Sequence, residues 1–250
     1  MTSPASPDLS LLDPATVQRG LMVAPAARGL VLIAHSSDAS RQQAGHGFVA
    51  DVLHANGFAT LPFSLNTPQD TAAELAPPGM VQSRQRLRGL LDWVLGQPSL
   101  GDRPLALIGV GDASAVCVAV AARCRRTELH CLVLLDAKAD KLAHHLVHLS
   151  LPALFVLGQC NARRLARQRV ALRDILADHR LEMLSQPTLP QPAAGALEAF
   201  ACAALEWLDR SLAHRSRAAG GAGRPSSHTG TGRGDPARGP TDRSQSTARA

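Results

Sequence analysis

The chain has 250 residues, with 26 Lys and Arg against 20 Asp and Glu and a formal charge of +6. Residues 214–250 hold seven Arg and two Asp, so +5 of that charge lies in the C-terminal segment; 19 basic minus 18 acidic residues leave +1 for the first 213. This distribution argues against a basic globular surface that binds nucleic acid. A body of about 200 residues is long enough for one domain with a substantial core.

Cysteine usage and the apolar segments bear on the compartment. The five Cys form no CxxC pair and are odd in number, which is typical of reduced thiols and predicts a cytoplasmic protein. The first ten residues, MTSPASPDLS, lack the basic and apolar regions of a signal peptide. The most apolar window, 104–122, contains Asp112 and has the pattern of a strand followed by a helix, so we expect no membrane span.

From residue 29 onward, short apolar runs alternate with amphipathic segments. The predicted strands are residues 29–35, 58–65, 105–111, 129–136, 152–158 and 180–185. The predicted helices are residues 39–57, 80–96, 113–125, 139–149, 162–178 and 194–212. In the first helix, Ser40 and Gln43 have capping-box spacing and Gly57 is a natural stop. The helix over 162–178 is predicted to bury Leu165, Leu172, Ile175 and Leu176.

Six strands alternating with six helices predict a three-layer α/β/α sandwich with a mostly parallel sheet. Ligand sites in such sheets lie beyond the carboxyl ends of the strands. The segments to inspect are therefore 35–40, 109–114, 136–140, 158–162 and 186–195.

The predicted domain spans residues 19–213, after an irregular N-terminus over 1–18. Residues 214–250 contain no Leu, Ile, Val or aromatic residue. Such a segment cannot bury enough apolar surface to offset the entropy lost on ordering. It is predicted to be a disordered tail rich in Arg, Gly and Ser.

The order of these segments resembles the α/β-hydrolase fold, and more narrowly the small dienelactone-hydrolase-like serine hydrolases. The resemblance runs from about Leu21 to Leu212. It is carried by ARGLVLIAHSSDASR, GFVADVLHANGFATLPFSLNTP, LALIGVGDASAVCVAVAA, LPALFVLG and GALEAFACAALEWL. The first stretch is the most telling, because members of the family have a His-Gly-Ser-rich turn followed by Ser-Arg there.

The resemblance implies a nucleophile elbow, G-x-S-x-G, after the central strand. The matching segment here is Gly109-Val110-Gly111-Asp112-Ala113. The flanking small residues are kept as Gly109 and Ala113, but the nucleophile position is Gly111, which has no side chain. Glycine adopts the strained backbone of such a turn at little cost, so Gly111 keeps the turn without the nucleophile.

The positions of the acid and the base are also substituted. Asn161 stands at the position of the family's Asp, and Leu189 at that of its His. No His occurs between His179 and His214. Asn161 carries no charge to stabilise an imidazolium, and Asp112 would oppose an oxyanion forming beside it. The resemblance and these substitutions together predict a non-catalytic binding or regulatory homologue, a pseudoenzyme, which needs no cofactor.

A working hydrolase with a displaced nucleophile is the alternative. Asp112 could attack as a carboxylate, although a helix N-cap or first-turn acid explains it as well. Ser114 would lie one turn into the helix, where its hydroxyl bonds backbone. Loop shaping and capping are the usual roles of the serines after the first strand, Ser36, Ser37 and Ser40. His35, Ser36, Ser37 and Asp112 form the predicted ligand cleft, with His35 read either as a hydrogen-bonded structural residue or as a ligand contact.

The remaining sequence features concern metal binding and partners. His144, His145 and His148 form an HHxxH cluster without the glutamate of HExxH or an evident third ligand, so we expect a solvated face and no metal. The occupant of the cleft, a small molecule or a protein, is not indicated by the sequence. A second alternative is a tail that binds nucleic acid or acidic surfaces, weakly supported because the tail has no aromatic residue to stack on bases. No membrane partner is expected.

Overall fold

The computed structural model describes residues 21–22, 26–36, 40–66, 79–188 and 195–220. Within these residues one sheet forms, with all strands parallel and in the order β2-β1-β3-β4-β5-β6. Its strands are β1 (Leu30–His35), β2 (Ala59–Ser64), β3 (Leu105–Val110), β4 (Cys131–Leu135), β5 (Ala153–Leu157) and β6 (His179–Met183). Each lies within its predicted run or starts one residue before it, which confirms the predicted α/β class.

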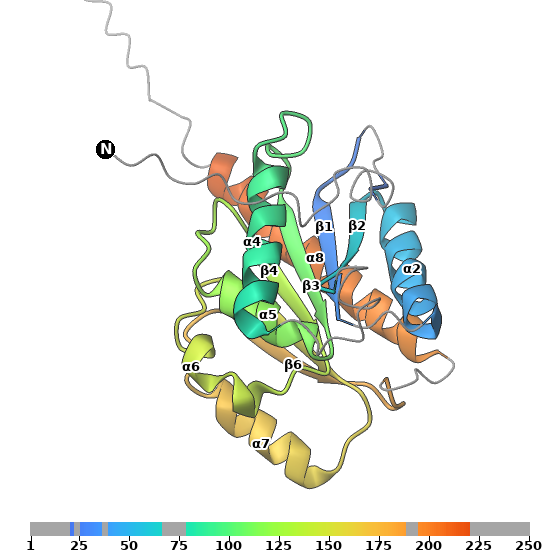
Figure 1. The fold of residues 1–250 in the computed structure, drawn as a ribbon, viewed down its shortest axis with the longest axis vertical. Helices are drawn as coiled ribbons and strands as arrows, with labels where there is room; N and C mark the ends of the chain where they lie inside the picture. Colours follow the sequence, from blue (N-terminus) through green and yellow to red (C-terminus); the bar gives the residue numbers. More distant parts are fainter. Residues whose placement is uncertain (1–20, 23–25, 37–39, 67–78, 189–194, 221–250) are drawn as a thin grey trace, which may run out of the picture.

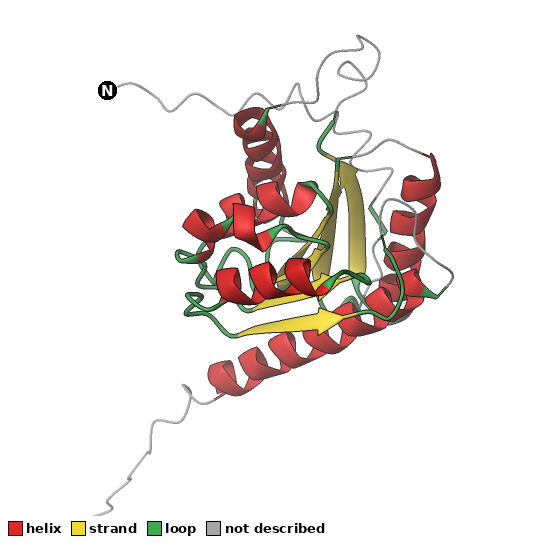
Figure 2. Ribbon diagram, turned by 90° about the horizontal axis from the view of Figure 1, so that it is seen from below, coloured by secondary structure: helices red, strands yellow, loops and turns green. Residues whose placement is uncertain are grey.

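Helices cover both faces of the sheet (Figures 1 and 2). They are α2 (Ser40–Ala55), α4 (Met80–Leu95), α5 (Ala113–Ala121), the 3-10 turn η2 (Ala139–Lys141), α6 (Ala143–Leu146), α7 (Ala162–Leu172) and α8 (Ala196–Gly220). Helices α2 and α8 pack on one face and α4, α5, α6 and α7 on the other. The result is the predicted three-layer sandwich.

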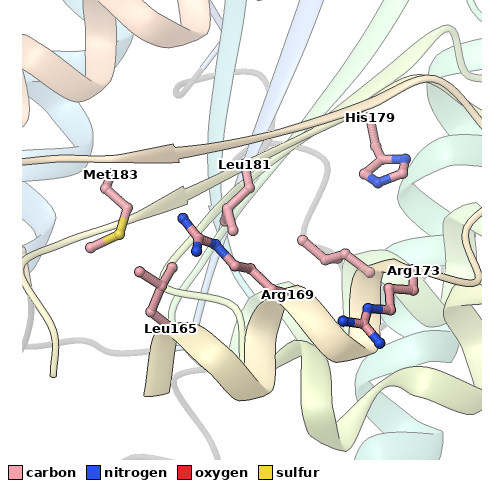
Figure 3. Close-up of a pocket in the computed structure, with 7 residues that line it drawn as sticks. Leu165, Arg169, Arg173, His179, Leu181 and Met183 are labelled. Carbon is pink, nitrogen blue, oxygen red and sulfur yellow. The ribbon is translucent and has the colours of Figure 1, made fainter. Parts of the chain in front are cut away.

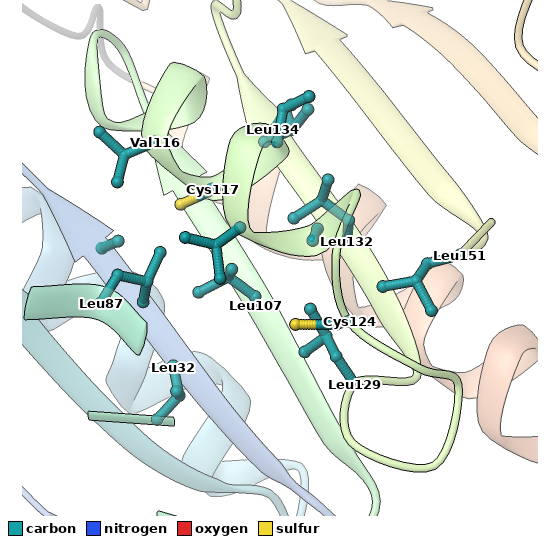
Figure 4. Packing of buried hydrophobic residues seen from close by; sticks show 14 of the residues in the cluster. Leu32, Leu87, Leu107, Val116, Cys117, Cys124, Leu129, Leu132, Leu134 and Leu151 are labelled. Carbon is teal, nitrogen blue, oxygen red and sulfur yellow. The ribbon is translucent and has the colours of Figure 1, made fainter. Parts of the chain in front are cut away.

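The core has two halves because side chains of a strand alternate between the faces of the sheet. On β1, Leu30 and Leu32 pack with α4 and α5, whereas Val31 and Ile33 pack with α2 and α8. Figure 4 shows the first half, where Leu87, Leu107 and other apolar side chains meet around Cys117 and Cys124. A sheet covered on both faces explains why its central strands are continuous apolar runs.

Several helix boundaries differ from the sequence prediction, and three of the differences are the largest. Residues 139–149 form a 3-10 turn and a short helix, η2 and α6, instead of one helix. Helix α7 ends at Leu172, so Leu176 falls off its helical period and is 92% exposed, and the prediction that it is buried was wrong. Helix α8 continues to Gly220, past the predicted boundary at 213; residues 221–250, most of the predicted tail, lie outside the described residues.

Candidate functional site

A tight turn joins β3 to α5 at the carboxyl edge of the sheet. Gly111 sits in it with φ +59, a left-handed conformation that glycine tolerates better than other residues. Its N–H donates to the carbonyl oxygen of Leu135 at 2.9 Å, which ties the turn to the end of β4. A Cβ at Gly109 would lie 2.8 Å from Cys117 Sγ and 2.9 Å from Ser114 Cα. Close approach of strand and helix therefore requires glycine there.

The two polar side chains beside Gly111 have different surroundings. Asp112 occupies the N-cap position of α5 but makes no side-chain cap bond. Its side chain is 78% exposed, and Lys138 Nζ donates to Oδ1 at 2.9 Å. Ser114 is fully buried and its Oγ donates to the carbonyl oxygen of Gly109 at 2.9 Å, the backbone bond predicted from the sequence.

A buried carboxylate, Asp136, lies at the end of β4 and is only 4% exposed. Its Oδ1 accepts hydrogen bonds from Gly158 N at 3.2 Å and from Arg164 Nη2 at 3.0 Å. The Thr188 hydroxyl donates to Oδ2. Asp136 itself has φ +54, so its backbone adopts a conformation uncommon outside glycine. One carboxylate thus joins the ends of β4 and β5, the start of α7 and the loop after β6.

The predicted acid position, Asn161, is a helix cap. Its Oδ1 accepts from Arg164 N at 2.9 Å, at the start of α7. Asn161 is therefore joined to Asp136 through Arg164. Leu189, the predicted base position, lies outside the described residues, but its neighbour Thr188 is bonded to Asp136. The structure consequently brings Gly111, Asn161 and the residue before Leu189 to one edge of the sheet.

The other half of this edge is built from the ends of β1 and β2. His35, 7% exposed, ends β1, and its carbonyl oxygen accepts from Leu65 N at 2.7 Å. Asn66 Nδ2 donates to the carbonyl oxygen of Ser36 at 2.7 Å. Arg86 is buried and donates from Nη1 to the Leu65 carbonyl oxygen at 2.7 Å. Of the remaining predicted serines, Ser37 lies outside the described residues and Ser40 starts α2.

Sequence reasoning marked the loop 136–140 but missed Asp136, Arg164 and Thr188 as a unit. The signal for Asp136 was present, because an acid follows directly on the apolar run LVLL at the carboxyl end of a parallel strand. No local sequence pattern indicated that Arg164 and Thr188 would be its partners. Gly158 shows why they meet: a Cβ on it would overlap the Thr188 hydroxyl, so this glycine lets the loop after β6 lie against β5.

The HHxxH histidines lie on and just after α6, whose Leu146 packs in the half of the core beneath α4 and α5. His144 and His145 are on α6 with ring centroids 3.9 Å apart, and burial, with the charge of His144 next, lowers the pKa of His145. The described residues contain no group of three or more metal-ligating side chains. All five Cys are free thiols; burial raises the pKa of Cys131 to about 12 and also raises that of Cys117.

Solved structures share this architecture. Dienelactone hydrolase from Anabaena variabilis is 26% identical, with a TM-score of 0.68 over 76% of this chain and 90% of that one. The chain has the α/β-hydrolase fold. The esterase domain of a Rhodothermus marinus protein, 14% identical with a TM-score of 0.59 over 77% and 92% of the two chains, shares the fold. The resemblance to dienelactone hydrolase inferred from the sequence is confirmed.

The curated relatives give a different name to a longer protein. A "putative phosphoribosyl transferase" of Mycobacterium tuberculosis, found in two strains, is 29% identical over 145 residues, which are 58% of this chain. The chain spans about a third of the length of these relatives, 32%. The name with its transferase activity therefore describes longer proteins, and this chain matches only a minor part of their length. No protein-family model matches the chain.

Among the described residues, none of the helices combines the length and apolar character needed to cross a bilayer.

Proposed function

We propose that this protein is a non-catalytic, dienelactone-hydrolase-like member of the α/β-hydrolase fold that binds a ligand or partner at the carboxyl edge of its sheet. The observation that carries the proposal is Gly111 at the β3–α5 turn. In this fold the turn presents the nucleophile. A glycine at φ +59 keeps the turn and offers no attacking atom.

The neighbouring side chains support the proposal because they are engaged elsewhere. The hydroxyl of Ser114 is buried and donates to backbone, so a substrate cannot reach it. Asp112 is paired with Lys138 at the surface. A carboxylate held there opposes the negative charge that develops on a substrate oxygen during acyl transfer.

The acid side of the site supports it as well. Asn161 uses its side-chain oxygen to cap α7, and Asp136 accepts from three donors. An acid that orients a histidine must accept a hydrogen bond from the imidazole. With three of its roughly four acceptor positions taken by Gly158, Arg164 and Thr188, Asp136 holds four chain segments together.

Reaction with a fluorophosphonate probe and with short-chain aryl esters tests the proposal. The wild-type chain is expected to be neither labelled nor active above the buffer rate. Gly111→Ser alone is expected to stay inert, because Leu189 provides no base. The triple variant Gly111→Ser/Asn161→Asp/Leu189→His restores the three residue types of the triad, and labelling of this variant alone would support the assignment of the three positions.

The alternative, an active hydrolase with a displaced nucleophile, rests on the exposure of Asp112 at the edge. Ester turnover by the wild-type chain that disappears in Asp112→Asn, or labelling that disappears in Ser36→Ala, would establish this alternative and refute the proposal. Binding of nucleic acid by the basic tail stays a prediction, since residues 221–250 lie outside the described residues.

We also propose a cytoplasmic location. The five free thiols suit a reducing compartment. Burial keeps Cys117 and Cys131 in the unreactive thiol form by raising their pKa values.

A further inference from the structure

A groove of about 330 Å³ lies between α7 and the edge strand β6, and it is lined by none of the residues described above for the carboxyl-edge site. We call it the α7–β6 groove. Its lining residues are Leu165, Arg169, Leu172, Arg173, His179, Leu181 and Met183. Four of them are apolar and three carry cationic or titratable groups, and no Asp or Glu is among them.

The groove exists because β6 is the last strand of the sheet and α7 covers it incompletely. Alternation places His179, Leu181 and Met183 on the side of β6 that faces α7. Helix α7 packs over the loop after β4 and leaves part of β6 uncovered. Gln168 on α7 accepts from Ala139 N at 2.6 Å and donates to the Ala137 carbonyl oxygen at 2.7 Å. Met183 consequently stays 40% exposed.

The two arginines of the groove lack the ion pairs that neighbouring arginines make. Arg164 is paired with Asp136, Arg180 with Glu182 and Glu206, and Arg210 with Asp178. Within the part of the chain that the structure describes, Arg169 and Arg173 have no side-chain hydrogen bond or ion pair.

The side chains of the groove are arranged along its length. Figure 3 shows Arg169 reaching from α7 toward Leu181 and Met183, with Arg173 and His179 at the opposite end. The Nδ1 atom of His179 lies 3.0 Å from the Ala177 carbonyl oxygen, which fixes the ring at that end. A guanidinium group thus lies against apolar side chains that are open to solvent.

We propose that the α7–β6 groove binds a small amphipathic anion, a carboxylate or phosphate monoester on a short alkyl or aryl body. The planar guanidinium of Arg169 matches the two oxygens of such a head group. Leu165, Leu181 and Met183 supply the apolar surface for its body. A volume of about 330 Å³ suits a small ligand. The proposal is independent of whether the chain catalyses a reaction.

Titration of the full chain labelled with ¹³C in its methionine methyl groups tests the site directly. The chain has four Met, and Met183→Leu identifies the signal of the one in the groove. We expect octanoate and octyl phosphate to shift this signal saturably, and the tighter of the two identifies the preferred head group. Arg169→Gln is expected to weaken binding about tenfold or more, because a hydrogen bond to a charged group is lost. Arg163→Gln is the matched control, since it removes the same charge from an exposed position of α7 outside the groove.

Several results would overturn the proposal. They are the absence of a shift at Met183, equal binding by wild type and Arg169→Gln, and equal binding of neutral octyl glucoside below its micelle concentration. Acetate and inorganic phosphate binding as tightly as the octyl compounds would show that the apolar residues take no part. A shift with polyglutamate but not with octanoate would show an acidic protein segment to be the occupant instead.

Discussion

The carboxyl edge of the sheet and the α7–β6 groove both gather polar side chains, but they use them differently. At the carboxyl edge, Asp136 is 4% exposed and bonded to three donors from three segments. In the groove, Arg169 is exposed and has no protein partner among the described residues. The difference shows that polar residues at the expected place in a fold need not be available for ligands, since they can be consumed by the structure itself.

The largest expected effect breaks the carboxyl-edge network. Asp136→Asn keeps the size of the side chain, and asparagine also tolerates a positive φ. The substitution removes the charge that faces Arg164. Removing one partner of a largely buried pair is expected to lower the free energy of unfolding by about 3 kcal/mol. Urea unfolding followed by circular dichroism measures it.

Two matched variants sharpen that comparison. Asp112→Asn breaks an exposed pair and is expected to cost at most about 0.5 kcal/mol. Arg169→Gln is expected to leave the unfolding free energy unchanged, because Arg169 has no partner in the described structure to lose. If Asp136→Asn cost no more than these two, the network would not be the structural centre of the edge.

A smaller effect concerns the turn that carries Gly111. Gly109→Ala would place a Cβ 2.8 Å from Cys117 Sγ, so strand and helix must separate, at a cost of about 2 kcal/mol. On α2, a Cβ at Gly47 would have no atom within 4 Å. Gly47→Ala is therefore expected to raise the free energy of unfolding by about 0.5–1 kcal/mol, because alanine has the higher helix propensity. Thermal unfolding is expected to show a lower melting temperature for Gly109→Ala and a higher one for Gly47→Ala. A higher melting temperature for both variants would contradict the close approach at Gly109.

The smallest effect is a pH dependence remote from both regions. Glu128 accepts from Arg125 N and from Arg88 Nη2, both at 2.8 Å, and these bonds lower its pKa. Its contribution to stability, about 0.5 kcal/mol, is present above the ordinary glutamate pKa of about 4.3 and is lost as the pH falls through the lower pKa of the folded state. The melting temperature of wild type should exceed that of Glu128→Gln at pH 6 and approach it near pH 3. A constant difference across that range would contradict the assignment.

Strand runs were predictable because they depend on local sequence. LVLLD, LALIGVG and PALFVLG are apolar over strand length and end in small or polar residues, so strand positions and the parallel class followed directly. Helix ends were less predictable. The apolar pattern of α7 extends to Leu176, yet the helix stops at Leu172 because packing, more than periodicity, decides where it ends.

The sequence by itself determined the α/β architecture, the glycine at the β3–α5 turn and the resemblance to dienelactone hydrolase, because each depends on local patterns and residue identities. Only the tertiary structure decided which polar groups are engaged. Asp136, Arg164 and Thr188 are up to 52 residues apart and meet because parallel strands bring their carboxyl ends to one edge. The α7–β6 groove likewise depends on where α7 rests against the sheet, a long-range packing choice that no local pattern encodes.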